Sequence, residues 1–177
     1  MDSITGRGHT PDKAEFHQAI ARYSERWFGA CLRITGDAGL AEDALQDALL
    51  SAWRKRGQYQ STAQLETWIH RIAVNAALQL LRRQRPGRQE PLEVEPPDET
   101  RSPERLVQQA ALAGDLERAL GGLSDMERVC FVLKHLEQWQ LSEIATELGG
   151  SVGSVKQALF RGVKKLRVSM TAAGVMP

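Results

Sequence analysis

Three carboxylates lie close together in one segment of the sequence, Glu42, Asp43 and Asp47, with Gln46 beside them. Carboxylates at this spacing can hold a cation or move a proton. The four histidines, however, are scattered along the chain, and none stands at ligand spacing to these acids. The sequence also has no phosphate-binding glycine loop and no nucleophile elbow. We therefore interpret the cluster as a solvated or partner-binding face, and expect no catalytic residue, no metal and no cofactor.

Residues 141–167 have the spacing of a helix-turn-helix. A segment of helical apolar spacing ends at Leu148, a glycine-containing turn follows, and a longer basic segment begins near Val152. Units of this kind place their second helix in the major groove of DNA. Because the turn must be tight, we expect Gly149 to adopt the left-handed conformation at the helix end. Ser151 is expected to cap the second helix.

The second helix of this unit carries a strong positive charge. Between Ser151 and Ser169 there are five Lys or Arg and no Asp or Glu. The apolar stripe expected on the core side of this helix comprises Val152, Val155, Leu159, Val163 and Leu166. A solvated basic helix in a small bundle would share this pattern, but the coincidence of turn, length and absent acids favours DNA binding. The residues expected to face duplex DNA are Ser154, Lys156, Gln157, Phe160, Arg161 and Lys164.

A further candidate surface combines an aromatic residue with arginines. Trp68 lies near the start of a helix predicted over 65–83, after a polar segment. Aromatic and arginine side chains on one element suit stacking on unpaired bases. The alternative is that Trp68 packs in the core, as aromatic residues at helical spacing commonly do. A polar stripe on the same helix, for which packing offers no role, comprises Arg71, Asn75, Gln79, Arg82 and Arg83.

These candidate surfaces lie on helices, because apolar residues recur every three or four positions along most of the chain. No strand-like alternation competes, so the expected fold class is all-α. Helices are predicted over 12–34, 40–56 and 65–83, and helical spacing resumes at about Leu106. Residues 84–104 hold five of the seven prolines and many charges, which predicts a flexible linker. Two small helical domains are therefore expected.

Local signals also predict helix ends and buried positions. Ser124 is a candidate N-cap, with Glu127 three residues later completing a capping box. A break is expected near Gln138. Cys31 and Cys130 each lie within an apolar helical pattern, so we expect both to be buried as small hydrophobic side chains.

The formal net charge of the chain is only +1, but its charges are segregated. Four arginines and no acid occur over 82–88, whereas six acids and one arginine occur over 90–104. Local charge, rather than net charge, decides where a polyanion binds. The N-terminus lacks the apolar core of a signal peptide, and no run of about 18 apolar residues occurs. We therefore expect a cytoplasmic protein without membrane insertion.

Taken together, these segments resemble the extracytoplasmic-function group of the sigma-70 superfamily. Residues 34–55, ITGDAGLAEDALQDALLSAWRK, are similar to the family segment that docks on the clamp helices of the largest RNA polymerase subunit. Residues 65–85, LETWIHRIAVNAALQLLRRQR, are similar to the segment that opens and reads the minus-ten element. Residues 116–167 are similar to the fourth conserved region, which reads the minus-thirty-five element. Three motifs in the family order are far more specific than one helix-turn-helix.

The resemblance implies a sigma factor, not an enzyme, that binds core RNA polymerase and directs promoter-specific initiation of transcription. The implied partners are core polymerase (clamp helices and flap), promoter DNA and, as is common in the family, an anti-sigma factor. The implied organisation is an N-terminal tail over 1–12, a region 2 domain over 13–85, a linker over 86–108, a region 4 domain over 109–171 and a C-terminal tail over 172–177.

Residue by residue, the resemblance assigns roles to the candidates above. The residues implied to contact polymerase are Glu42, Asp43, Gln46, Asp47 and Trp53. The residues expected at the minus-ten element are Gln58, Tyr59, Ser61, Trp68, Arg71, Asn75, Arg82 and Arg83. The residues expected at the minus-thirty-five element are those already assigned to duplex DNA. Ala158 stands where the family commonly has an arginine that contacts DNA, which implies an altered preference for the minus-thirty-five sequence.

Two other classes of protein remain as alternatives. A stand-alone repressor or activator would use the helix-turn-helix alone and bind duplex DNA without polymerase, as a dimer on a palindrome. That class leaves the acidic face and the second basic helix unexplained. A nucleic-acid enzyme or metalloprotein would need a ligand or nucleophile constellation, which this sequence lacks.

Overall fold

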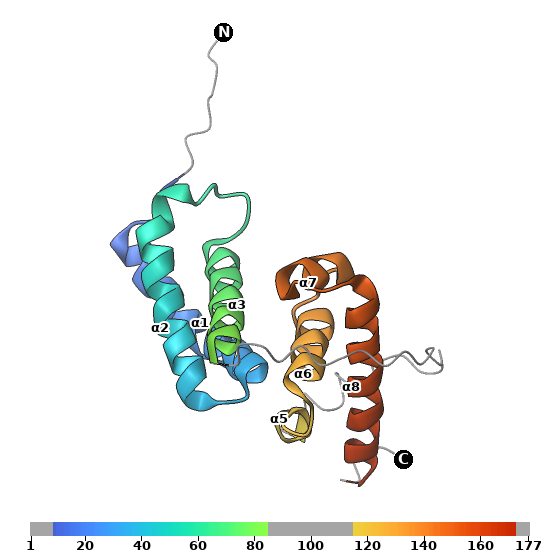
Figure 1. Cartoon of the computed structure of the whole chain (residues 1–177). Helices are drawn as coiled ribbons and strands as arrows, with labels where there is room; N and C mark the ends of the chain where they lie inside the picture. The colour runs from blue at the N-terminus through green and yellow to red at the C-terminus, as the bar shows by residue number, and fades with distance from the viewer. Residues whose placement is uncertain (1–8, 85–114, 173–177) are drawn as a thin grey trace. The chain divides into compact units, whose positions relative to one another are not determined.

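The computed structural model describes residues 9–84 and 115–172, and the chain divides into two units, Met1–Pro86 and Gly87–Pro177. All regular structure within the described residues is helical, which confirms the all-α expectation. Figure 1 shows α1, α2 and α3 in the first unit and α5 to α8 in the second. The predicted linker and the resumption of helix at Leu106 lie outside the described residues.

The first unit consists of three helices that pack on one another, α1 (Lys13–Thr35), α2 (Ala38–Lys55) and α3 (Leu65–Gln84). A short 3-10 turn, η1 (Arg56–Gln58), follows α2. Each observed helix end lies within two residues of its predicted position. The hydrophobic period and the glycine-containing polar breaks between the segments therefore located these helices.

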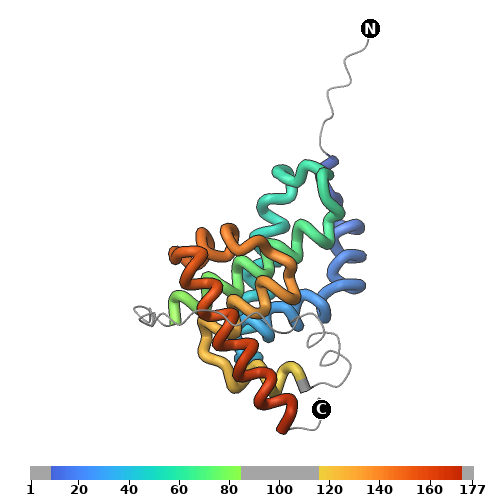
Figure 2. Tube along the Cα trace, turned by 90° about the vertical axis from the view of Figure 1, so that its right-hand side faces the viewer, coloured from blue at the N-terminus to red at the C-terminus, as the bar shows by residue number. Residues whose placement is uncertain are grey.

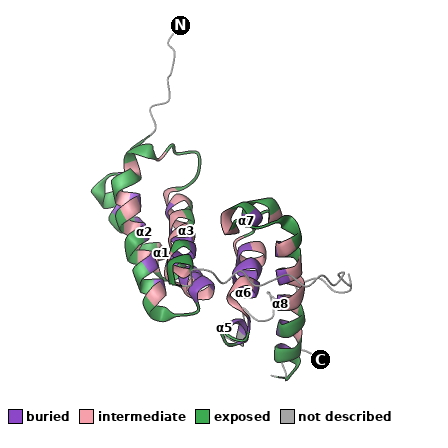
Figure 3. Ribbon diagram, viewed as in Figure 1, coloured by how far each residue is buried: buried purple, intermediate pink, exposed green. Residues whose placement is uncertain are grey.

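The inward face of α2 is made of alanine. Ala41, Ala44, Ala48 and Ala52 are all fully buried, at the three- and four-residue spacing of one helix face. The larger core side chains come from the other two helices and include Trp27, Ile34, Ile69, Val74 and Leu78. Because the separation of packed helices depends on the side chains at the contact, methyl groups on α2 let it approach α1 and α3 closely. The opposite side of α2 carries most of its exposed residues (Figure 3).

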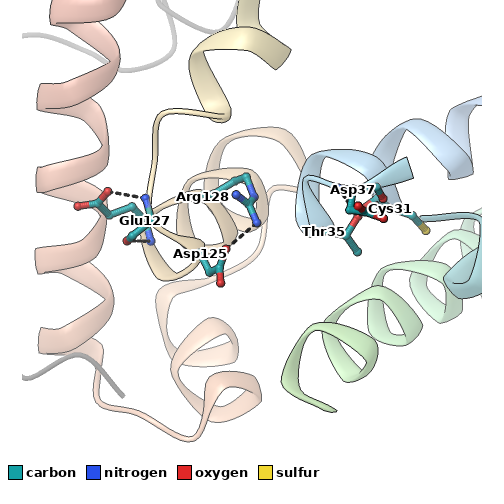
Figure 4. Close-up of polar contacts among 7 residues, drawn as sticks. Cys31, Thr35, Asp37, Asp125, Glu127 and Arg128 are labelled. Carbon is teal, nitrogen blue, oxygen red and sulfur yellow. Dashed lines mark hydrogen bonds and ion pairs between the residues drawn. The ribbon is translucent and has the colours of Figure 1, made fainter. Parts of the chain in front are cut away.

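A polar network closes the turn between α1 and α2. Gly36 ends α1 in the left-handed region with φ of 68°, and its N–H donates to the carbonyl oxygen of Leu32. The buried Thr35 hydroxyl lies 2.9 Å from the carbonyl oxygen of Cys31 and 3.0 Å from that of Asp37 (Figure 4). The Asp37 side chain accepts from the N–H of Leu40 and caps α2. These contacts set where the acidic segment of α2 begins.

The second unit contains α5 (Asp115–Leu120), α6 (Asp125–Phe131), α7 (Leu141–Leu148) and α8 (Val152–Ala172), with α6 continued by a π-helical turn, η2 (Val132–Leu136). Helix α8 packs against α5, α6 and α7. Figure 2 traces it as the longest helix of this unit. The predicted Ser124–Glu127 capping box begins α6. Gln138, with φ of 59°, lies in the non-helical segment before α7, where a helix break was expected.

The predicted core stripe of α8 was wrong in part. Val155 and Leu166 are buried as expected, but Val152 is exposed, and Leu159 and Val163 are only half-buried. The buried stripe is instead Val155, Ala158, Gly162, Leu166 and Met170. Small residues at two of these positions form the contact with the rest of the unit, and a pattern built on large apolar side chains overlooks them. Ala158 is fully buried, so its side chain belongs to the core and not to a DNA-contacting surface.

Both cysteines are buried and neither forms a disulfide, as expected. The Cys31 thiol lies 3.6 Å from the carbonyl oxygen of Ala73, and burial raises the pKa of the Cys130 thiol to about 12. Both side chains therefore act as core packing groups. Within residues 9–84 and 115–172, no helix is both long and apolar enough to cross a membrane.

Candidate nucleic-acid and protein interfaces

The acidic cluster forms one exposed face of α2. Glu42, Asp43, Gln46 and Asp47 are all exposed, on two successive turns of the helix. Among the described residues, none of the three carboxylates forms an ion pair, so their charge is available to a partner. On the next turn Leu50 is 55% exposed, although it is a large apolar side chain. An exposed apolar group next to carboxylates and an amide on one helix face matches the apolar centre and polar rim of protein-docking surfaces. We call these five residues the α2 face.

Leu50 was missed in the sequence, although a signal for it was present. It follows Asp43 by seven positions, Gln46 by four and Asp47 by three, which places it on the same helix face. The inward alanines explain why it points outward. The core on this helix is already formed by Ala41, Ala44, Ala48 and Ala52, so the larger leucine is left on the outside.

Trp53, which was grouped with the α2 face, packs within its own domain. Its ring meets that of Phe16 edge to face, with centroids 5.3 Å apart and an interplanar angle of 72°. The guanidinium of Arg56 lies 3.9 Å from the ring centroid, and its Nη1 donates to the backbone oxygen of Trp53. Trp53 therefore joins α1 to α2, and its contact with polymerase stays a prediction.

The loop before α3 is closed by an aromatic pair. The rings of Tyr59 and Trp68 lie 5.5 Å apart, and the Tyr59 hydroxyl donates to the carbonyl oxygen of Ala63 at 2.6 Å. Ser61 has a φ of 54°, the left-handed region, which turns the chain within the loop. Gln58 and Ser61 are exposed, whereas both rings are only partly accessible. Trp68 thus supports the loop and still presents part of its surface to solvent.

The polar stripe of α3 lies on the surface of the domain. Arg71, Arg82 and Arg83 are exposed and Asn75 is half-buried. The Asn75 Oδ1 atom is buried and has no hydrogen-bond partner among the described residues. Asn75 and Arg83 line a groove of about 270 Å³ between α2 and α3, together with Asp47, Ala48, Ser51, Lys55, Ile72, Ala76, Gln79 and Leu80. The structure thus brings predicted DNA-contacting residues and one residue of the α2 face to a single groove.

The helix-turn-helix has the predicted local geometry. Gly149 ends α7 with φ of 65°, and the N–H of Gly150 donates to the carbonyl oxygen of Ala145 at 2.9 Å. The N–H of Ser154 donates to Ser151 Oγ at 3.1 Å, which confirms Ser151 as the cap of α8. The N–H of Ser151 donates in return to Ser154 Oγ at 3.0 Å. The Ser154 hydroxyl is therefore committed to this cap as well as being a candidate for DNA contact.

The outward face of α8 carries the remaining candidates for duplex contact. Lys156 and Lys164 are exposed, and Gln157 and Phe160 are half-buried beside them. The Gln157 Oε1 atom is buried and lacks a hydrogen-bond partner among the described residues. A glutamine amide and two ammonium groups on one helix face suit base-edge and phosphate contacts in a major groove.

Arg161 differs from these, because an acid from α6 contacts it. Its Nε atom lies 3.7 Å from Oε1 of Glu127, and the Lys165 Nζ lies 2.8 Å from Oε2 of the same carboxylate. Glu127 also accepts from the N–H of Ser124 at 3.0 Å. Burial alone would raise the pKa of Glu127, but the hydrogen bonds from Lys165 and Ser124 and the charges of Lys165 and Arg161 outweigh it and hold the pKa below its ordinary value.

The same residues line an open groove along the seam between α6 and α8. Its volume is about 670 Å³, and its lining residues are Ala119, Gly122, Ser124, Glu127, Arg161, Lys164, Lys165, Val168 and Ser169. Lys165 was not among the predicted site residues. The pairing with Glu127 joins residues 38 positions apart, which no local pattern reveals.

Comparison with known proteins supports this two-part organisation. The family model for Sigma-70 region 2 matches residues 19–86, and that for Sigma-70 region 4 matches residues 113–166. The chain is 32% identical over 155 residues to the ECF RNA polymerase sigma factor SigM of Mycobacterium tuberculosis, covering 88% of this chain and 76% of that one. It is 30% identical over 153 residues to SigE of Mycolicibacterium smegmatis, in a match that covers 85% of this chain but only 59% of that relative.

A solved structure shows the same fold. The sigma factor RpoE of Bartonella quintana, crystallised in complex with the anti-sigma factor NepR, matches with a TM-score of 0.55 and 20% sequence identity. The match covers 89% of this chain and 97% of that one.

Proposed function

The chain belongs to the sigma-70 family, within its group of ECF RNA polymerase sigma factors, and from this premise we propose that it binds core RNA polymerase and directs promoter-specific initiation of transcription. One observation carries the proposal. An exposed acidic helix face and a basic helix-turn-helix lie in separate domains, and the matched regions 2 and 4 follow in the family order. The proposed role is binding, not catalysis, and its place is the cytoplasm, where polymerase works.

The α2 face is the proposed contact with polymerase. Exposed carboxylates around a partly exposed leucine are complementary to a basic, partly apolar surface, and the clamp helices of the largest subunit are the proposed site. Charge complementarity of this kind speeds and orients association.

The minus-ten element is the proposed ligand of the Gln58–Ala63 loop and the polar stripe of α3. The loop is held by the Tyr59–Trp68 pair, and Arg71, Arg82 and Arg83 are exposed along the following helix. Unpaired bases stack on aromatic surfaces while cations contact the backbone. Capture of a flipped base offsets the few kcal/mol needed to unstack and unpair it.

The outward face of α8 is the proposed reader of the minus-thirty-five element. Polymerase, through its clamp helices and flap, would hold both domains at the spacing of the promoter. Two weak sites at a fixed separation raise each other's effective concentration, so the pair binds a promoter that neither site would hold alone. An anti-sigma factor is a further proposed partner.

Transcription in vitro tests the proposal directly. Core RNA polymerase with this protein is incubated with a pool of genomic fragments, and initiation from discrete sites is expected. The reversal Asp43→Arg/Asp47→Arg should weaken binding to core polymerase in a pull-down without unfolding the domain, because both carboxylates are exposed. Matched controls are Glu25→Arg on α1 and Glu117→Arg on α5, which reverse exposed acids elsewhere and should leave binding intact.

Two outcomes would count against the proposal. If the double reversal binds core polymerase as well as the original chain does, the α2 face is not the contact. If the purified chain recognises duplex sites tightly without polymerase and never supports initiation, the stand-alone regulator is the better account.

A further inference from the structure

Glu127 is a carboxylate buried between α6 and α8. Its side chain is only 3% exposed, and it points from α6 toward α8 (Figure 4). A buried carboxylate is costly unless hydrogen bonds and opposite charges compensate it. Here the N–H of Ser124 and the Lys165 ammonium donate to Oε2, and Arg161 lies near Oε1. Both cations come from α8. This carboxylate therefore connects α6, whose capping box it completes, to α8, the proposed recognition helix.

The two cations lie at the edge of the proposed DNA-reading face. Arg161 is 34% exposed and Lys165 is 53% exposed, and they are four residues apart on the same side of α8. Arg161 is also one turn beyond Gln157, a candidate for base contact. Both cations could reach DNA phosphate if they were released. In this structure Lys165 donates to the carboxylate at 2.8 Å, and Arg161 Nε, which has no hydrogen-bond partner among the described residues, lies 3.7 Å from Oε1.

Close packing between the helices keeps the carboxylate at this place. Gly162 lies on α8 between the two cations, and a Cβ added there would stand 3.5 Å from both the Cβ and the backbone oxygen of Glu127. The backbone of α8 therefore runs directly against Glu127. Since Ser124, at the N-cap of α6, donates to the same carboxylate, the side chain is fixed at both ends.

We propose that Glu127 is a positioning residue for promoter recognition: it withholds Lys165 and Arg161 from non-specific phosphate contact and fixes the Arg161 side chain beside the base-reading residues of α8. The inference rests on the proposed function. Its physical basis is that contacts with phosphate do not depend on the DNA sequence, whereas contacts between a fixed side chain and base edges do. Glu127 thus lowers total attraction to DNA and raises the fraction of it that depends on sequence.

The test uses Glu127→Gln in the full chain, because glutamine keeps the shape and can still accept from Ser124. Binding to a duplex of scrambled sequence is measured by fluorescence anisotropy at several salt concentrations. Each released cation should steepen the logarithmic salt dependence by about 0.9, so that the affinity ratio between about 50 and 200 mM salt grows about 3.5-fold. Affinity for the scrambled duplex at low salt should rise. The control Asp125→Asn changes a carboxylate of the same helix that pairs with Arg128, and should leave the slope unchanged.

Lys165→Gln completes a double-mutant cycle. Because Glu127 holds Lys165, this change alone should leave the salt slope of the original chain unaltered, whereas in the Glu127→Gln background it should remove the contribution of one cation. A loss of slope of about 0.9 in the single variant would overturn the proposal, and that variant remains informative even if Glu127→Gln does not fold. Weaker binding of folded Glu127→Gln at every salt concentration, with an unchanged slope, would indicate a structural role alone and also overturn it.

Transcription distinguishes failure of this inference from failure of the proposed function. With core polymerase, Glu127→Gln should initiate from a wider set of fragments than the original chain. If the original chain selects discrete promoters and the variant selects the same ones with the same preference, the role of Glu127 is refuted and the sigma function stands. If the original chain supports no initiation, the proposed function fails, whatever the salt slopes are.

Discussion

Truncation of Leu50 to alanine is the sharpest test of the α2 face. Leu50 is 55% exposed in the free chain, so just over half of its surface is left for a partner to bury. Full burial of a leucine contributes about 1.5–3 kcal/mol, and the exposed share corresponds to about 0.8–1.6 kcal/mol. Loss of that share should weaken binding to core polymerase about 4- to 15-fold. The affinity is measured by titrating labelled protein with core polymerase.

Val168→Ala is the matched control for this change. Val168 is another exposed apolar residue, 68% accessible, but it lies on α8 in the second domain. Its truncation should leave the affinity within about two-fold of the original, because it lies outside the α2 face. Circular dichroism melts of both variants check that neither domain is unfolded. If Leu50→Ala binds as tightly as Val168→Ala does, then the apolar part of the α2 face contributes nothing and the reasoning from exposure is refuted.

The remaining predictions concern the second domain, and urea unfolding with hydrogen exchange of α6 and α8 measures all of them. Ser124→Ala removes the acceptor of the Glu127 N–H and should cost about 1 kcal/mol; an unchanged midpoint would contradict the cap. Gly149→Ala should lower the free energy of unfolding by about 1–2 kcal/mol, because φ at this position is 65°. Gly162→Ala should instead raise it by up to about 1 kcal/mol, because alanine favours the helix and its Cβ would lie 3.5 Å or more from its neighbours. Equal losses of stability in the two variants would refute this contrast. The pKa of Glu127 is lowered on folding, so its stabilisation is complete above its ordinary value of 4.5 and is lost as pH falls through the lower folded value. Stability should therefore fall with acidification below pH 4.5 more steeply than in Glu127→Gln, and parallel curves would disprove it.

The parts of the fold that depend on residues close together in the sequence were predictable. Gly149 and Ser151 were assigned to the turn and cap of the helix-turn-helix, and the structure has both in those roles. The Ser124–Glu127 capping box was also predicted correctly. Such signals span three or four residues, so the chemistry of the side chain and the geometry of the backbone determine them together.

Features that depend on packing between helices were predicted less well. The stripe of α8 was misplaced because Ala158 and Gly162, which make its core contact, carry little apolar surface of their own. Glu127 was assigned to its cap alone, since its partner Lys165 is 38 residues away and on another helix. Only the packed arrangement of helices shows that one side chain serves both contacts.

The exposed residues of the candidate site followed from polarity and period, but their surroundings did not. Asp43 and Arg71 are exposed as their helical phase indicated. Trp53 lies on the helix predicted for it, but its ring contacts Phe16 and Arg56. The Phe16 ring comes from α1, a helix earlier in the chain, so this contact could not be read from the local sequence. Whether it also contacts polymerase stays a prediction.

The alanines beneath the α2 face also determine how thick the first domain is between α2 and α3. Each of the four contributes a single methyl group to the packed side of α2, which lets α2 lie close to α3. A larger residue at Ala44 or Ala48 would push α2 outward as a whole. The carboxylates and Leu50 would keep their chemistry but move away from the arginines of α3, so the proposed polymerase contact would move away from the proposed DNA contact. The buried alanines of α2 thus set the distance between the α2 face and the polar stripe of α3.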